Sequence, residues 1–204
     1  MRLIVVLILF LALGPVVEAL AAPVQWSANG HYYEYVPTRL NWSAALAEAN
    51  SRSYLNLPGY LATVTSADEN AFVSSLLANA EWGAWLAGSD AAVEGEWRWV
   101  AGPEAQQIFW QGDQHGAPVA GAYNNWATNE PNNLNTENSL AIWGPNGANG
   151  ATSWSQWNDF QGSDTQGYIV EYSAIPEPST RLLSVLGGAV LMAWSFRGSI
   201  LAKS

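Results

Sequence analysis

The sequence predicts an α+β domain in which two helices come first and short strands follow. Three observations favour this class. Two early segments place apolar residues at helical spacing, several later segments alternate between apolar and polar residues, and a long stretch from 111 to 137 is rich in Gly, Asn and Pro. Twelve Trp residues among 204, with charged residues at only 12%, indicate a folded core rather than a disordered chain.

The first elements follow from local pattern. Residues 27–36 carry three Tyr residues and predict an opening strand. Asn41 is a suitable helix cap, and apolar residues then recur at i, i+3, i+4 and i+7, which predicts a helix over 42–50. A Pro-Gly turn at 58–59 precedes a short expected strand at 61–64.

The second helix begins at a capping-box sequence. Ser66 and Glu69 have the spacing at which each side chain satisfies a free backbone N–H at the helix start. Asp68 and Glu69 also suit the positive end of the helix dipole. We therefore expect a helix from Ala67 to about Ala80.

Strand patterns dominate the second half of the chain. The expected strands lie at 97–99, 108–110, 139–143 and 168–172. Residues 111–137 contain no long regular pattern, and a loop of that length inside a compact domain usually has a function. Residues 144–153 form a polar insertion. Four Trp residues in strand-like sequence are expected in the core: Trp85, Trp97, Trp99 and Trp157.

Charge and composition exclude several functions. Between residues 23 and 175 there are fifteen acidic and three basic residues, a balance that repels phosphate backbones and argues against nucleic-acid binding. The chain has no cysteine, so thiolate zinc sites and thiol nucleophiles are excluded.

Both ends carry targeting patterns. Residues 1–22 combine a basic start, an apolar run and small residues, which predicts a secretory signal peptide. Near the other end, Pro176-Glu177-Pro178 is followed by an apolar segment over 182–196 and then by Arg197 and Lys203. At 1.5 Å per residue, that segment reaches about 22 Å, so it spans a bilayer only with help from flanking residues.

Oxygen-bearing side chains accumulate in the irregular region. Three carboxylates and two amides stand at Glu130, Asn132, Glu137, Asn158 and Asp159. Calcium takes about 6–8 oxygen ligands in flexible geometry, so five converging side chains would leave positions that the hydroxyls of a sugar could fill.

These residues also carry a resemblance to a known family. Glu130-Pro131-Asn132, Glu137 and the later Trp157-Asn158-Asp159 resemble the calcium and sugar site of C-type lectins, and Trp85-Leu86-Ala87-Gly88 is similar to a conserved family segment. The resemblance covers about residues 26–173, which gives expected domains of 1–22, 23–174 and 175–204. It implies a C-type lectin-like fold in which two helices pack on short antiparallel sheets beside a long irregular calcium-binding loop region.

The resemblance also implies roles. All five residues would bind Ca²⁺, and Glu130, Asn132, Glu137 and Asn158 would also bind the sugar. The Glu130–Pro131 bond is expected to be cis. The Glu-Pro-Asn order is associated in the family with mannose-, fucose- or N-acetylglucosamine-type glycans. Asp90 and Glu94 stand at the spacing of a second calcium site.

The C-terminal segment resembles the PEP-CTERM sorting signal of Gram-negative bacteria. That resemblance implies an exosortase-type processing enzyme as a partner, a membrane segment about 182–196, and a domain outside the inner membrane, at the cell envelope or in the extracellular matrix. A natural ligand would then be an exopolysaccharide or another surface glycan.

Alternatives remain open at this point. The domain could bind a protein or serve a matrix-structural role, with calcium only stabilising the loops. A glycosidase using two carboxylates is disfavoured because calcium-bound carboxylates are poor proton donors, so we predict no enzymatic activity. Trp126 could stack on a sugar. His31 and His115 have no partner at metal-ligand spacing and are expected at the surface.

Overall fold

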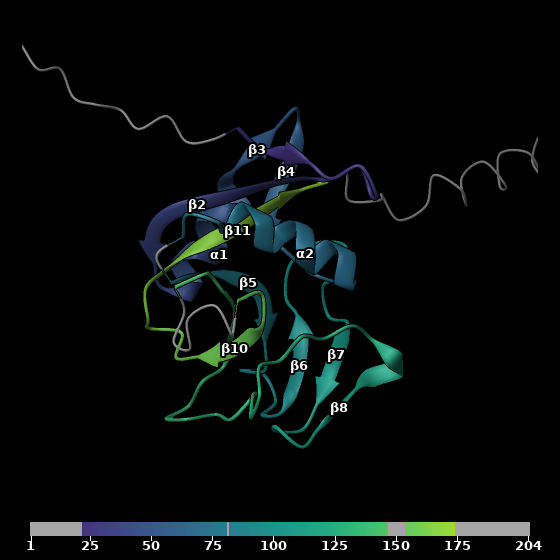
Figure 1. Ribbon diagram of the computed structural model, residues 1–204, viewed down its shortest axis with the longest axis vertical. Helices are drawn as coiled ribbons and strands as arrows, with labels where there is room; N and C mark the ends of the chain where they lie inside the picture. Colours follow the sequence, from purple (N-terminus) through teal and green to yellow (C-terminus); the bar gives the residue numbers. More distant parts are fainter. Residues whose placement is uncertain (1–21, 81, 147–153, 174–204) are drawn as a thin grey trace, which may run out of the picture.

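The computed structural model describes residues 22–80, 82–146 and 154–173 (Figure 1). Residues 1–21 of the expected signal peptide, most of the polar insertion and the whole sorting signal lie outside these residues. Within the described ranges, no helix has both the length and the apolar character needed to cross a membrane.

The two predicted helices are α1, Trp42–Ser51, and α2, Ala67–Leu76. Asn41 caps α1 by accepting a hydrogen bond from the backbone N–H of Ala44 at 2.9 Å. Ser66 caps α2 through the N–H of Glu69 at 3.2 Å. The capping box is only half formed, because the Glu69 carboxylate accepts from the N–H of Thr65 at 2.7 Å.

The strands form one connected sheet system. Their bounds are β1 Val24–Gln25, β2 Tyr32–Leu40, β3 Ser53–Tyr54, β4 Leu57–Leu61, β5 Gly83–Ser89, β6 Glu96–Trp99, β7 Ile108–Gln111, β8 Ala117–Pro118, β9 Ser139–Trp143, β10 Trp157–Phe160 and β11 Gln166–Tyr172. A short 3₁₀ turn, η1, covers Val119–Gly121. The main path runs β1-β2-β11-β5-β6-β7-β8, with β3 paired to β4, β4 to β11, and β9 between β5 and β10.

The predicted fold class is confirmed, with a difference in strand direction. The resemblance implied short antiparallel sheets, but β11 runs parallel to β5, with Tyr168 opposite Trp85. Parallel neighbours need a long connection, and here most of the second half of the chain separates the two strands. The sheet is therefore mixed.

Two element boundaries differ from the sequence prediction. The opening strand was placed at 27–36 but begins at Tyr32, because residues 26–31 make a turn in which Gly30 has φ +79°. Helix α2 was expected to reach Ala80 but ends at Leu76, where the N–H of Leu77 turns back to the carbonyl of Ser74 at 3.0 Å. The expected strand at 61–64 is displaced to β4.

The core is aromatic, as predicted. Trp85, Trp97, Trp99 and Trp157 are each at most 2% exposed. Trp99 stacks on Phe109 with ring centroids 4.5 Å apart and meets Trp157 edge-on at 5.9 Å. Such pairs contribute about 0.5–1.5 kcal/mol each beyond their buried area, which helps a domain without disulfides to hold its loops.

Both ends of the described chain lie at one end of the molecule. Gln25 of β1 and Tyr172 of β11 both pair with Tyr32 of β2. In Figure 1 this end is at the top, while β6, β7, β8 and β10 are at the bottom. Segments that leave the domain at either end therefore start away from the β6–β8 region.

Candidate metal and ligand site

The irregular loop that follows η1 is hydrogen-bonded to β10 through its backbone. The N–H of Trp157 donates to the carbonyl of Asn125 at 2.7 Å, and the N–H of Ala127 donates back to the carbonyl of Trp157 at 2.8 Å. Trp126 and Trp157 thus form a parallel bridge. This bridge sets Glu130, three residues after Ala127, beside the Asp159 carboxylate on β10.

The loop has an unusual backbone between residues 129 and 136. The Glu130–Pro131 peptide bond is cis, the conformation that the resemblance led us to expect. Four non-glycine residues have positive φ: Asn129, Asn133, Asn135 and Thr136. Asn tolerates the left-handed region better than most residues, which accounts for the run of Asn in this segment.

Hydrogen bonds inside the loop orient its carboxylates and amides. The Asn132 side-chain amide donates to Glu130 Oε2, while Asn132 Oδ1 accepts from the N–H of Leu134 at 2.8 Å. The same N–H also donates to Glu137 Oε2 at 3.0 Å. Asp159 Oδ2 accepts from the N–H of Asn133 at 2.7 Å. The loop and β10 therefore share one polar network.

The pKa values of the two loop carboxylates, Glu130 and Glu137, are raised. Burial raises the pKa of Glu130 to about 8, with further contributions from the charge of Asp159, a hydrogen bond to it and the charge of Glu137. Burial and the charge of Asp159 raise the pKa of Glu137 to about 7, against the hydrogen bond from Leu134. Desolvated like charges at one place favour either protonation or a bound cation.

Asp159 supplies an independent test of whether a cation fits. Its side chain is fully buried, and Oδ1 has no hydrogen-bond partner. A buried carboxylate oxygen without a partner is costly, and a hard cation would satisfy it. The donor set therefore fits Ca²⁺. Within residues 22–80, 82–146 and 154–173, however, no three His, Cys, Asp or Glu side chains are drawn together at metal-binding spacing.

Asn158 is the fifth predicted residue. It lies on β10, is 8% exposed, and its side-chain amide donates to the carbonyl of Asp159. Neighbouring side chains of a strand point to opposite faces, so β10 alone does not bring the Asn158 side chain to the carboxylate of Asp159.

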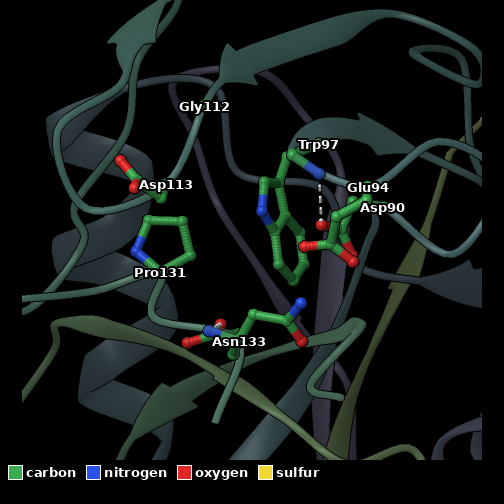
Figure 2. A pocket seen from close by; sticks show the side chains of 9 residues that line it. Asp90, Glu94, Trp97, Gly112, Asp113, Pro131 and Asn133 are labelled. Carbon is green, nitrogen blue, oxygen red and sulfur yellow. Dashed lines mark hydrogen bonds between the residues drawn. The ribbon is translucent and has the colours of Figure 1, made fainter.

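A cavity of about 410 Å³ adjoins this network (Figure 2). It is lined by Asp90, Glu94, Gly95, Trp97, Gly112, Asp113, Pro131, Asn133 and Asp159. The two residues predicted for a second calcium site thus face the same cavity as Asp159. Asp113 and Asn133 were not predicted, and no spacing pattern in the sequence marked them.

Asp90 is well satisfied by protein donors. Its Oδ2 accepts from the N–H of Gly95 at 2.9 Å, and the amide nitrogen of Asn138, in the orientation that satisfies its neighbours, donates to Oδ1 at 3.2 Å. Burial, with the charges of Glu94 and Asp159, raises the pKa of Asp90 to about 6. The neighbouring side chains of Asn133 and Asn138 are neutral amides. Carboxylates in their place would bind a second cation more strongly.

Trp126 does not extend toward ligand. It packs edge-on against Trp97 at 4.9 Å and Trp157 at 6.0 Å, and its indole Nε1 is buried. The Trp126 ring is partly buried and packs against the aromatic core, which leaves less of it for the sugar stacking considered from the sequence.

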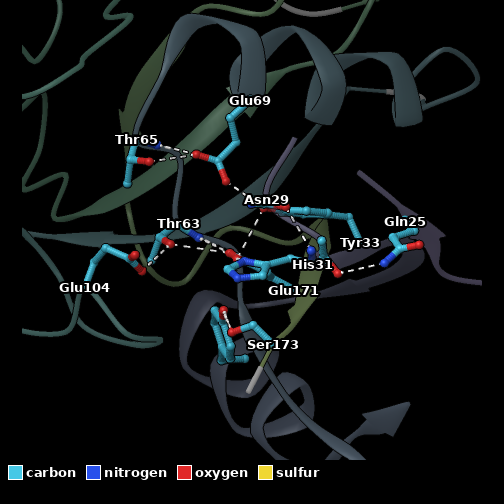
Figure 3. Close-up of polar contacts among 12 residues, drawn as sticks. Gln25, Asn29, His31, Tyr33, Thr63, Thr65, Glu69, Glu104, Glu171 and Ser173 are labelled. Atoms are coloured by element: carbon cyan, nitrogen blue, oxygen red, sulfur yellow. Dashed lines mark hydrogen bonds and ion pairs between the residues drawn. The ribbon is translucent and has the colours of Figure 1, made fainter. Parts of the chain in front are cut away.

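His31 is also placed differently from the expectation. Its Nδ1 contacts Glu171 Oε1 at 2.6 Å (Figure 3). Glu171 is 1% exposed and also accepts from Tyr33 at 3.2 Å, while Tyr33 donates to Glu69 at 2.6 Å. Burial raises the pKa of Glu171, and the hydrogen bond to Glu171 raises the pKa of His31. A proton shared by these two side chains is therefore released only at a higher pH than from either residue alone in water. The two residues are too far apart in sequence for any local pattern to reveal the contact.

Known proteins share both sequence and fold with this chain. Residues 39–171 match the family model of the lectin C-type domain. The chain belongs to that family. Halomucin of Haloquadratum walsbyi is 38% identical over 147 residues, a region that covers 72% of this chain and 2% of halomucin. The chain thus spans a small part of that relative's length.

Solved structures share the fold. The C-type lectin CEL-I from Cucumaria echinata superposes with a TM-score of 0.53 and 26% identity, over 74% of this chain and 97% of that one. A Ca²⁺-dependent type II antifreeze protein, in its Ca²⁺-free form, gives a TM-score of 0.54 at 19% identity, over 74% and 97% of the two chains. At that identity the second likeness concerns the fold alone.

Proposed function

We propose that this domain binds carbohydrate through a calcium ion held by Glu130, Asn132, Glu137, Asn158 and Asp159. The observation that carries the proposal is the buried Asp159 carboxylate, whose Oδ1 has no hydrogen-bond partner and whose charge acts on Glu130 and Glu137 of the loop. Calcium, when bound, supplies open coordination positions to which sugar hydroxyls can bind.

The chain's own groups determine which sugar fits. A hydroxyl can donate to a carboxylate and accept from an amide at the same time. Glu130 as acceptor and Asn132 as donor set the direction of that pattern, which favours mannose-, fucose- or N-acetylglucosamine-type sugars over galactose. We expect single-site dissociation constants of about 1 mM, with useful retention only on multivalent glycans.

We further propose that the domain acts outside the inner membrane of a Gram-negative bacterium, exported by residues 1–22. The Pro-Glu-Pro segment would be handled by an exosortase-type enzyme, and residues 182–196 would attach the chain to the membrane. A surface polysaccharide is the natural ligand in that place. The charge of −10 agrees with a cation-requiring role and argues against a nucleic-acid partner.

A glycan array, probed with the full chain in calcium and again in chelator, tests the proposal. We expect binding to mannose-type glycans in calcium alone. The matched variants are Asp159→Asn, which removes a proposed ligand charge at nearly constant volume, and Asp68→Asn, which removes an exposed charge on α2. Loss of binding in the first variant only would support the site. If calcium raised thermal stability while no glycan bound, a protein-interaction or matrix-structural role would replace this proposal.

A further inference from the structure

A second hollow lies away from the proposed calcium site. It has a volume of about 320 Å³ and is lined by Arg39, Trp82, Trp143, Phe160, Asp164, Thr165 and Gln166. We call it the aromatic groove. A smaller hollow of about 160 Å³ shares Arg39, Trp82 and Gln166 with it and extends it. The groove has no lining residue in common with the cavity at Asp90 and Asp159.

Strand alternation separates the two sites. Asp159 and Phe160 are neighbours in β10, so their side chains point to opposite faces of the strand. Asp159 faces the calcium loop, and Phe160 packs edge-on against Trp143 at 5.0 Å and Trp85 at 5.9 Å. Trp82 precedes β5, whose first residue, Gly83, pairs with Trp143. Trp82, Trp143 and Phe160 thus line one hollow near the ends of β5, β9 and β10.

The groove combines exposed aromatic surface with an unsatisfied acceptor. The Trp82 side chain is 46% exposed, a large apolar surface for a soluble domain. Gln166 is only 6% exposed, and its Oε1 is buried without a hydrogen-bond partner. An unpaired buried acceptor is unfavourable, so a ligand that donates a hydrogen bond there would be favoured. Arg39 and Asp164 place one positive and one negative charge on the rim.

We infer that the aromatic groove is a second carbohydrate subsite that binds a neutral pyranose unit without calcium. The C–H face of a pyranose ring can lie on the negative face of an indole, and its hydroxyls provide the donor that Gln166 Oε1 lacks. The charges of Arg39 and Asp164 offset each other on the rim, so the groove favours neither an acidic nor a basic ligand, and a purely apolar ligand would leave Gln166 unpaired. The volume lies at the small end of ligand pockets, which suits one or two sugar rings.

The experiment measures binding in chelator, where the calcium site cannot contribute. Three neutral probes, mannohexaose, cellohexaose and xylohexaose, are titrated into the full chain with tryptophan fluorescence as the readout. We expect saturable binding of at least one probe, weakened about tenfold by Trp82→Ala. The matched control is Trp154→Ala, which removes another half-exposed indole, 41% exposed, outside the groove.

Several results would overturn the inference. These are no saturable binding of any probe in chelator, full binding by Trp82→Ala, or equal losses in Trp82→Ala and Trp154→Ala. Displacement of the bound probe by a peptide of residues 174–190 would assign the groove to the chain's own C-terminal segment instead. If no probe binds in chelator but glycans still bind in calcium, the aromatic groove is not a sugar site and the proposed function stands. If a probe binds in chelator but no glycan binding depends on calcium, the groove binds sugar and the proposed calcium site does not.

Discussion

Calcium binding should release protons, and the structure indicates how many. With pKa values of about 8 for Glu130 and about 7 for Glu137, the two carboxylates together hold about 1.4 protons at pH 7 in the metal-free protein. Both must be ionised to coordinate Ca²⁺, so binding at pH 7 should release about 1.4 protons per ion. At pH 9 the same carboxylates are almost fully ionised, and release should fall to about 0.1.

The same linkage sets the pH dependence of affinity. Competition between protons and calcium at these two carboxylates makes the dissociation constant fall by about 500-fold from pH 6 to pH 8. Both side chains are partly exposed, so solvent screening reduces that figure, and we expect a decrease of at least about tenfold. Carboxylates with ordinary pKa values near 4.5 would give almost no change over this range.

Isothermal titration calorimetry measures both quantities. Calcium is titrated into the full chain at pH 7 in phosphate-free buffers of different ionisation enthalpy, and the slope of heat against ionisation enthalpy gives the protons released. A second ion at Asp90, whose pKa is about 6, would add protons mainly below pH 7. Fewer than about 0.3 protons at pH 7, with a flat affinity from pH 6 to 8, would refute the view that these carboxylates share one desolvated site.

Three further outcomes follow from the structure. Calcium at 100 times its dissociation constant should stabilise the folded protein by about 2.7 kcal/mol, which raises Tm in scanning calorimetry by several degrees. An unchanged Tm would contradict a calcium site that exists only in the folded protein. The double variant Glu130→Gln with Asn132→Asp should shift glycan-array selectivity toward galactose, and unchanged selectivity would count against the donor–acceptor argument. His31→Ala should lower the free energy of unfolding by about 1–3 kcal/mol at pH 5.5, in denaturant titrations, and by less at pH 9. The pKa of His31 in the folded protein lies above 6.5, so its contribution to stability is complete below pH 6.5 and is lost as pH rises through the folded-state pKa. The control is His115→Ala, at an exposed histidine. An equal loss of stability at both pH values would contradict the pairing of His31 with Glu171.

Much of the fold could be predicted from local pattern. The cap at Asn41, the helix start at Ser66 and the alternation around Trp97 and Trp99 each depend on residues a few positions apart. Burial of the four predicted core Trp residues followed from their strand-like surroundings. The parallel pairing of β5 with β11 could not be predicted, because no hairpin or short connection relates the two strands.

The candidate site was predicted as a set of residue types but not as a geometry. Glu130 and Asp159 are 29 positions apart, and it is the backbone bridge between Ala127 and Trp157 that brings them together. Trp126, beside that bridge, packs against the core while staying partly exposed, which the sequence did not predict. The His31–Glu171 pair and the aromatic groove likewise join residues from distant strands, and no spacing rule identifies such contacts.

A crystal structure of the full chain with calcium and methyl α-mannoside tests the central claim most directly. We predict one ion bound by oxygens of Glu130, Asn132, Glu137, Asn158 and Asp159 at about 2.3–2.6 Å, with two neighbouring sugar hydroxyls completing its coordination. A calcium ion bound elsewhere, or a sugar bound without contact to the ion, would contradict it.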